Sequence, residues 1–176
     1  MPFVFITGAA QGIGYATARR FAKAGWFVGL FDINRAQCIA HAASADFPTA
    51  IGGYCDVTSR ESVAAALAEF AEASDGRIDV LINNAGVLSA GDFAGMSLDQ
   101  LDAMADVNVK GLTTVSRLAF PFLKATPGSV MVNLCSASSI HGIPLLSDYS
   151  AIKFYVNGLC QALNIEWDEH DIHVTC

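Results

Sequence analysis

Short apolar runs alternate along the chain with longer stretches in which apolar residues recur at helical spacing. The runs predict six strands, at residues 3–6, 26–31, 51–55, 79–83, 129–134 and 172–176. The stretches between them predict helices, at about 13–25, about 34–46, 58–75, from 97, about 106–124, and 148 to about 169. Strands apolar enough for burial on both faces, alternating with helices, form a parallel sheet between two helical layers. The pattern predicts one three-layer, doubly wound α/β domain over residues 1–176.

Turn and capping residues set the expected ends of these helices. Thr58 with Glu61, and Ser97 with Gln100, have the spacing of capping boxes. Pro121 lies near the end of the helix expected over 106–124, where a missing N–H and a ring clash predict a kink.

Composition narrows the class of function. Of the 176 residues 53% are hydrophobic, and the net charge of −7 opposes binding to a phosphate backbone, so nucleic acid is not an expected partner. No apolar run approaches the roughly 18 residues of a membrane span, and no targeting segment precedes the first strand. We therefore expect a cytoplasmic protein without a membrane partner.

The cysteines and histidines do not suggest a metal site. Five cysteines occur without a C-x-x-C pair, and the four histidines are not spaced like zinc ligands beside them. We expect reduced, buried thiols and no metal.

A glycine-rich turn follows the first strand, with glycines at positions 8, 12 and 14. It delivers the N-terminus of a helix, with its unpaired N–H groups and partial positive charge, to the carboxyl edge of the sheet. Glycines there let the backbone approach a pyrophosphate. A tight turn that binds nothing is the alternative, because the spacing differs from the common G-x-G-x-x-G pattern.

An aspartate closes the second strand, eighteen residues after Gly14. Asp32 lies where a carboxylate accepts hydrogen bonds from the ribose of an adenine nucleotide and repels a 2′-phosphate. Neither Gln11 nor Ile33 is basic, so NAD is preferred over NADP; Arg35 is the one nearby basic residue, and a solvated helix arginine is its plainer interpretation. The alternative role for Asp32 is to cap the following helix.

A tyrosine and a lysine stand four apart at the start of the last helix, on one face. Tyr149 and Lys153 have Ser136 upstream, at the end of the fifth strand, and Asn108 on an earlier helix. A phenol with a pKa near 10 is a poor base at neutral pH, and lowering that pKa to about 7 requires about 4 kcal/mol from nearby positive charge. A partly dry cleft with a lysine nearby makes such a shift plausible for Tyr149.

Taken together, these residues resemble the short-chain dehydrogenase/reductase family, a Rossmann-like fold. The resemblance covers nearly the whole chain and rests on motifs in family order: Thr7-Gly8-x-x-x-Gly12-x-Gly14, Asp32, Asp56-Val57, Asn83-Asn84-Ala85-Gly86, Asn108-Val109-Lys110-Gly111, Ser136 and Tyr149-x-x-x-Lys153.

The resemblance implies a role for each motif. Tyr149 is the implied acid/base, Ser136 would bind the reacting oxygen, Lys153 would hold the nicotinamide ribose and lower the pKa of Tyr149, and Asn108 would hold a water of a proton relay. The implied cofactor-binding residues are Gly8, Gln11, Gly12, Ile13, Gly14, Asp32, Asp56, Val57, Asn84, Ala85, Gly86, Tyr149 and Lys153.

Two features depart from the family pattern. Ile152 replaces the usual Ser or Thr before the lysine, and we interpret it as a packing change toward the sheet. Members normally continue past the sixth strand with a substrate-covering segment and a seventh strand, which do not appear in this sequence. We therefore expect a fold that lacks them, as in a fragment or truncated chain.

The substrate side is less defined. His141 and the loop 140–147 are expected to border the substrate, although a solvated histidine is the plainer interpretation, and Leu88, Leu145 and Leu146 hint at an apolar pocket. The last helix carries a second apolar stripe, at Ala151, Phe154, Gly158, Ala162 and Ile165. This stripe predicts a homodimer or homotetramer through helices 106–124 and 148–169, as the resemblance also implies.

Two functional hypotheses follow. The first is an NAD-dependent oxidoreductase that interconverts a secondary alcohol and a ketone by hydride transfer. The second is a catalytically silent nucleotide-binding subunit or inactive fragment, suggested by the missing carboxyl-terminal segment.

Overall fold

Six parallel strands form a single sheet in the computed structural model, which describes residues 1–176. They are β1 (Phe3–Thr7), β2 (Phe27–Asp32), β3 (Ala50–Tyr54), β4 (Val80–Asn83), β5 (Ser129–Asn133) and β6 (Ile172–Thr175). Their order is β3-β2-β1-β4-β5-β6, so the direction of winding reverses between β1 and β4. In open α/β sheets the carboxyl ends beside this reversal form the usual ligand crevice.

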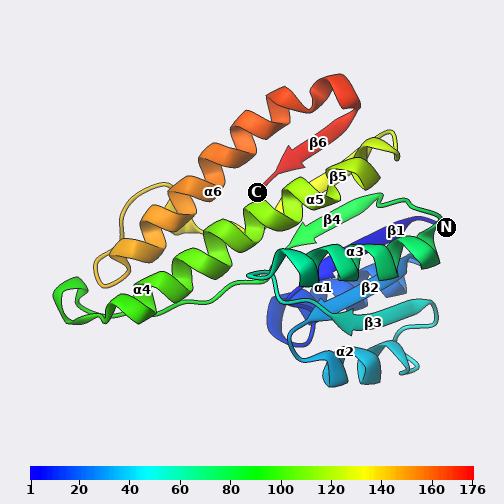
Figure 1. Ribbon diagram of the computed structural model, residues 1–176, viewed down its shortest axis with the longest axis horizontal. Coiled ribbons are helices and arrows are strands. Elements are labelled where there is room, and N and C mark those ends of the chain that lie inside the picture. Colours follow the sequence, from blue (N-terminus) through cyan, green and yellow to red (C-terminus); the bar gives the residue numbers. More distant parts are fainter.

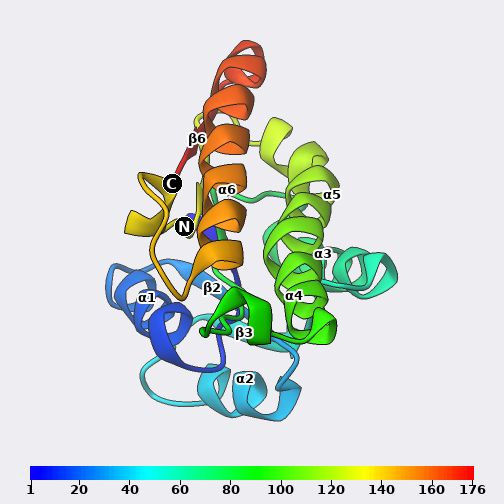
Figure 2. The ribbon, with the colours of Figure 1, turned by 90° about the vertical axis from the view of Figure 1, so that its left-hand side faces the viewer.

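Helices cover both faces of the sheet, as predicted (Figure 1). They are α1 (Gly12–Lys23), α2 (Arg35–Ala42), α3 (Arg60–Ser74), α4 (Leu98–Ala105), α5 (Leu112–Lys124) and α6 (Ser147–Glu166). Buried residues of α1 and α2 share one core cluster with β1 and β2, whereas α3, α5 and α6 share the other. Figure 2 shows the two groups of helices apart, with α6 beside α5. The three-layer, doubly wound prediction is confirmed.

The larger core is organised around three phenylalanines from different elements. Phe5 of β1 stacks on Phe31 of β2 at 4.5 Å between ring centroids, and it meets the edge of Phe70 of α3 at 5.4 Å. A Cβ on Gly29 would lie 2.6 Å from the Phe70 ring, so β2 needs a glycine there. The glycines in these strands therefore make room for side chains and neighbouring backbone.

Strand ends agree with the prediction to within one residue, but one helix cap does not. Helix α3 begins at Arg60 and its cap is Ser59, whose Oγ accepts a hydrogen bond from the Ser62 N–H at 3.2 Å. Thr58, the predicted cap, instead donates from both its N–H and its hydroxyl to Asp56. The predicted box of Thr58 with Glu61 is therefore wrong, whereas the box of Ser97 with Gln100 at α4 is present.

The chain is helical through residue 106, where we expected one helix to end and another to begin. A π-helical segment, η2 (Asp106–Gly111), joins α4 to α5 without a loop, so helical backbone runs from Leu98 to Lys124. Such widened turns are rare and frequently lie at functional sites.

Shorter helices complete the chain: η1 (Phe93–Gly95), η3 (Ala137–Ser139) and η4 (Asp168–His170). Helices α2 and α6 both end earlier than predicted, at Ala42 and Glu166. Ile152 of α6 is buried, in agreement with its interpretation as a packing residue. The second stripe of α6 is exposed along its whole length, from Ala151 to Ile165.

Candidate functional site

A cavity of about 660 Å³ opens at the carboxyl ends of β1, β2, β4 and β5. All of the predicted site residues line it except Gly12 and Gly14. The lining also includes residues that the sequence analysis did not assign to a site: Ile33, Cys55, Val87, Val107, Leu134 and Cys135. Most of these adjoin a predicted residue in the chain, so proximity along the strand ends is the signal that would have found them.

The glycine turn has two separate structural requirements. Gly12 has a φ of +58°, and nothing surrounds the position of its missing Cβ. A glycine is therefore needed there for its left-handed backbone conformation and not for lack of space. Gly14 is buried, and a Cβ there would collide with the carbonyl of Gly8. Gly14 therefore allows α1 to pack against the end of β1. We expected Gly14 to bind the cofactor, but it does not line the cavity.

Asn84 fastens this turn to β4. Its Nδ2 donates to the carbonyl oxygens of Thr7 and Gly8, both at 2.9 Å. The backbone N–H groups of Asn84 and Ala85 donate to the Thr7 hydroxyl, both at 3.1 Å. Asn84 lines the cavity, but its amide hydrogens are used to hold the turn.

Asp32 contacts the same turn from β2. Its Oδ2 accepts a hydrogen bond from the Ala10 N–H at 3.1 Å, and its Oδ1 accepts one from the Asn34 N–H at 2.9 Å. The cap of α2 is Asn34, so the alternative of Asp32 as the helix cap is excluded. Arg35 is exposed and does not line the cavity.

The next pair along the sheet edge, Asp56 and Val57, also lines the cavity. Asp56 accepts two hydrogen bonds from Thr58, at 2.9 and 2.7 Å, which fix the start of the connection to α3. Val57 is buried, and a Cβ on Gly111 of η2 would lie 2.7 Å from its Cγ2. A glycine in the widened turn therefore lets η2 approach this edge.

Asn108 is buried in η2, with only 2% of its surface exposed. Its Nδ2 donates to the carbonyls of Val87 at 2.7 Å and Met104 at 3.0 Å, and its Oδ1 accepts from the Val87 N–H at 3.0 Å. Both ends of the amide thus clamp the loop after β4. Both amide hydrogens of the side chain that was implied to hold a water are therefore used by protein carbonyls.

Lys153 is buried on the inner face of α6. Its Nζ donates to the Leu134 carbonyl at 2.6 Å and lies 5.4 Å from the centre of the Tyr149 ring. Burial lowers the pKa of this ammonium. The lysine therefore lies beside the ring, with its short hydrogen bond directed to the end of β5.

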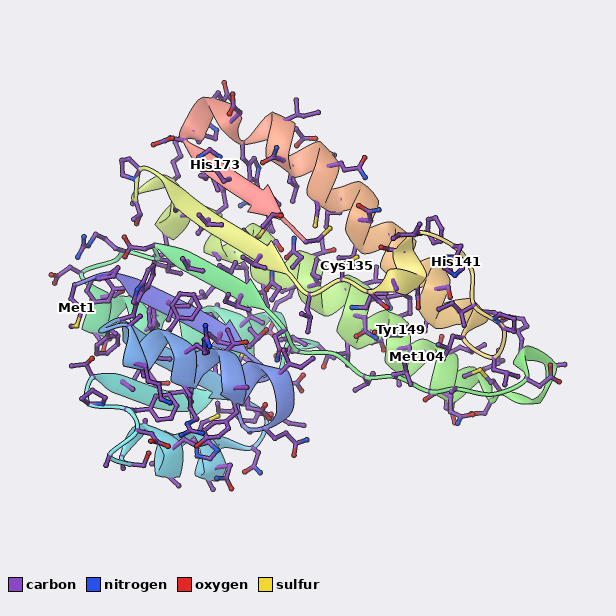
Figure 3. The ribbon with its side chains drawn as sticks, turned by 180° about the vertical axis from the view of Figure 1, so that it is seen from behind. Met1, Met104, Cys135, His141, Tyr149 and His173 are labelled. Atoms are coloured by element: carbon purple, nitrogen blue, oxygen red, sulfur yellow. The ribbon has the colours of Figure 1, made fainter.

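The pKa of Tyr149 is raised, opposite to the direction that the resemblance implied. Burial is the main cause, the neighbouring Cys135 thiol adds to it, and a hydrogen bond from Ser136 acts in the opposite direction. Ser136 also caps η3, accepting a hydrogen bond from the Ser138 N–H at 3.2 Å. In Figure 3, Tyr149 and Cys135 lie where α6 passes the end of β5.

The predicted substrate side is only partly in the cavity. Leu88 lines it, but Leu145, Leu146 and His141 do not. His141 is exposed on the loop before α6 (Figure 3). No three His, Cys, Asp or Glu side chains are grouped as metal ligands, and all five cysteines are free. None of the helices is long and apolar enough to cross a membrane.

Comparison with known proteins agrees with this geometry. The family model described as short chain dehydrogenase matches residues 2–176. Meso-2,3-butanediol dehydrogenase of Serratia marcescens is 37% identical over 93% of this chain and 64% of its own length. D-threitol dehydrogenase of Mycolicibacterium smegmatis is 32% identical over 96% of this chain and 65% of its own length. The chain thus spans about two thirds of the length of these relatives.

A solved structure is similar over almost the whole chain. The 3-ketoacyl-(acyl-carrier-protein) reductase from Brucella melitensis, crystallised as a complex with NADH, superposes with a TM-score of 0.91 at 27% identity. The match covers 98% of this chain and 73% of that one.

Proposed function

Because the chain belongs to the short-chain dehydrogenase family, we propose that it acts as an NAD-dependent oxidoreductase that interconverts a secondary alcohol and a ketone. The observation that carries this proposal is one cavity that brings Tyr149, Lys153 and Ser136 together with the glycine turn and Asp32. The names of the relatives, two dehydrogenases of polyols and a ketoacyl reductase, support the same reaction class.

The residues present fit a dinucleotide. The first turn of α1 has no side-chain cap, so its N–H groups are free to bind a pyrophosphate. Asp32 keeps lone pairs on both oxygens beyond its two backbone hydrogen bonds, and these suit ribose hydroxyls. The negative charge of Asp32 in the cavity, where Arg35 is not among the lining residues, favours NAD over NADP.

The chemistry divides between cofactor and protein. When bound, the nicotinamide cofactor gives or accepts the hydride. Tyr149 transfers the proton, donating it from its hydroxyl to the ketone oxygen or accepting it from the alcohol. Ser136 donates a hydrogen bond to that oxygen. Lys153, fixed by the Leu134 carbonyl, supplies positive charge that stabilises the phenolate form of Tyr149 during the transfer.

The raised pKa of Tyr149 sharpens this assignment. A phenol that burial keeps protonated is ready to act as the acid of ketone reduction, whereas alcohol oxidation requires added positive charge to ionise it. The mechanism therefore needs the bound cofactor as well as Lys153.

We also propose a homo-oligomer built on α6 and the helix from α4 to α5. Phe154 is 47% exposed and Ile165 is 78% exposed, on the face of α6 that points away from the sheet. Small residues lie between them, at Gly158 and Ala162, so another helix can approach closely. A second copy of this chain is the partner that this face fits.

The test is a panel of secondary alcohols and ketones with NAD(H), run on this chain and on a full-length version if its gene encodes one. Turnover with NAD(H) that requires Tyr149 supports the proposal. Tight NADH binding without turnover of any panel member in either version would instead favour the silent nucleotide-binding subunit.

A further inference from the structure

Ala10, in the middle of the glycine turn, is held through both of the peptide groups that flank its Cα. Its N–H donates to Asp32 Oδ2 at 3.1 Å. Its carbonyl oxygen lies 3.0 Å from Nε2 of His41, the penultimate residue of α2. A carbonyl oxygen only accepts, so Nε2 carries the hydrogen in this contact. His41 thus reaches 31 residues back along the chain to the turn.

The imidazole of His41 is itself fixed in orientation. It stacks on the Tyr15 ring of α1, with 4.0 Å between centroids and 27° between planes. The amide nitrogen of Gln37, one turn earlier on α2, lies 3.1 Å from the same Nε2. Both nitrogens carry hydrogen when His41 donates to Ala10, so Gln37 is then a packing neighbour of the ring and not its hydrogen-bond partner. Tyr15 in turn packs near Phe47 and beneath the Arg19 guanidinium. The ring therefore has a flat support and a polar neighbour, and little freedom to turn away from Ala10.

This contact acts on the part of the turn that faces the cavity. Gln11 directly follows Ala10, and Gln11 and Ile13 both line the cavity. Gln11 has an extended backbone and forms no side-chain cap, so no side-chain bond of its own fixes where the free N–H groups of α1 point. Gly12 next to it is in a left-handed conformation and open to solvent on its Cβ side. The orientation of the Ala10–Gln11 peptide group is therefore the nearest restraint on the free N–H groups of α1.

We propose that His41 is a positioning residue for the dinucleotide: it orients the Ala10–Gln11 peptide group, and through it the N–H groups that meet the pyrophosphate and adenosine half. This inference rests on the proposed function. It assigns to α2 a part in cofactor binding that neither the motifs nor the cavity lining contains, because His41 does not itself face the cavity.

Two substitutions separate the hydrogen bond from packing. His41→Leu keeps an apolar side chain against Tyr15 but removes the donor, whereas His41→Gln places an amide N–H near the position of Nε2. We expect His41→Leu to raise the Kd for NADH by about three- to tenfold, the equivalent of one hydrogen bond. We expect His41→Gln to stay within about twofold of wild type.

The readouts distinguish positioning from a general structural role. ADP-ribose should lose the same factor as NADH in His41→Leu, since it contains the pyrophosphate and adenosine, and KM for the cofactor should rise while kcat stays near wild type. Equal NADH affinity in wild type and His41→Leu would overturn the proposal. So would loss of NADH affinity with ADP-ribose affinity unchanged, or equal losses in the Leu and Gln variants.

A second variant covers the case in which His41→Leu does not fold. Tyr15→Leu leaves the donor in place but removes the flat face that orients it, and we expect a smaller rise in the Kd for NADH. Wild-type affinity in Tyr15→Leu would overturn the proposal even then. Failure of the proposed function looks different: the wild-type protein itself would either bind neither NADH nor ADP-ribose, or bind NADH and turn over no member of the panel.

Discussion

The ammonium of Lys153 lies 5.4 Å from the centre of the Tyr149 ring, yet its 2.6 Å hydrogen bond goes to the backbone of Leu134. The lysine is therefore held by the end of β5 and positioned next to the phenol. This arrangement requires a charged group to be buried, since Lys153 is only 6% exposed. The candidate site is thus built at a cost to the stability of the free protein.

That cost depends on pH. Burial lowers the pKa of Lys153 below its ordinary value of 10.5. The penalty for burying the ammonium is fully present below the folded-state pKa, and it disappears as the pH rises toward 10.5. We predict that the free energy of unfolding of wild type rises relative to that of Lys153→Met between pH 7 and 10.5. Urea unfolding of both proteins measures this, and a constant difference across the range would contradict it.

Two buried cysteine thiols make the free energy of unfolding change with pH in the opposite direction. Burial is the main cause that raises the pKa values of Cys38 and Cys55 from 9.0 to about 12. Above pH 9 these thiols ionise in the unfolded chain but not in the folded one, so stability is lost as the pH rises. We expect wild type to lose up to about 1.4 kcal/mol per pH unit for each thiol relative to a Cys38→Ala, Cys55→Ala variant. Denaturant titrations at pH 8 and 10 provide the comparison, and parallel losses in both proteins would argue against buried, protonated thiols.

Cofactor choice depends on Asp32. Asp32→Ala should weaken NADH binding and relax discrimination against NADPH by about tenfold or more, because it removes a ribose acceptor and a charge that repels the 2′-phosphate. The same change frees the Ala10 N–H, so Asp32→Asn is the matched control: it removes the charge but keeps an acceptor. Kd values for NADH and NADPH decide the matter. A wild type that binds NADPH more tightly would refute this interpretation and direct attention to Arg35.

The fold was predictable because its signals are local and repeated. Each strand combines an apolar run with turn residues, and the ends agree with the structure to within one residue. The cap of α3 was not predictable in the same way, since Thr58 and Ser59 are both good caps. The structure selects Ser59 because Asp56 already binds both the N–H and the hydroxyl of Thr58.

The site, like the fold, was predictable only in part. The sequence identified which residues gather at the sheet edge, because parallel strands bring their carboxyl ends together. It did not reveal how each side chain is used. The side-chain amides of Asn84 and Asn108 donate hydrogen bonds to backbone carbonyls, and burial raises the pKa of Tyr149. Such roles depend on distances between elements far apart in the chain, which no motif spacing records.

The oligomer prediction uses the open surroundings of Gly158. A Cβ there would meet nothing within 4 Å in the chain itself, so the monomer has room for a longer side chain. We expect Gly158→Arg to yield a monomer in sedimentation, because it places a charge in the middle of the proposed contact. Gly158→Ala is the control: it should strengthen the helix by about 1 kcal/mol and leave the oligomer intact. A wild type that is monomeric at micromolar concentration, or a Gly158→Arg variant that is still an oligomer, would show that this face of α6 is not the interface.

The central claim is that the Tyr149 hydroxyl carries the proton while the rest of the cavity binds the dinucleotide. Tyr149→Phe removes that hydroxyl and keeps the ring beside Lys153. The decisive measurement is kcat together with the Kd for NADH in this variant, on a substrate that the wild type turns over. We predict that kcat falls by at least about 100-fold while the Kd for NADH stays within a few-fold of wild type. A Phe variant with unchanged turnover would contradict the account.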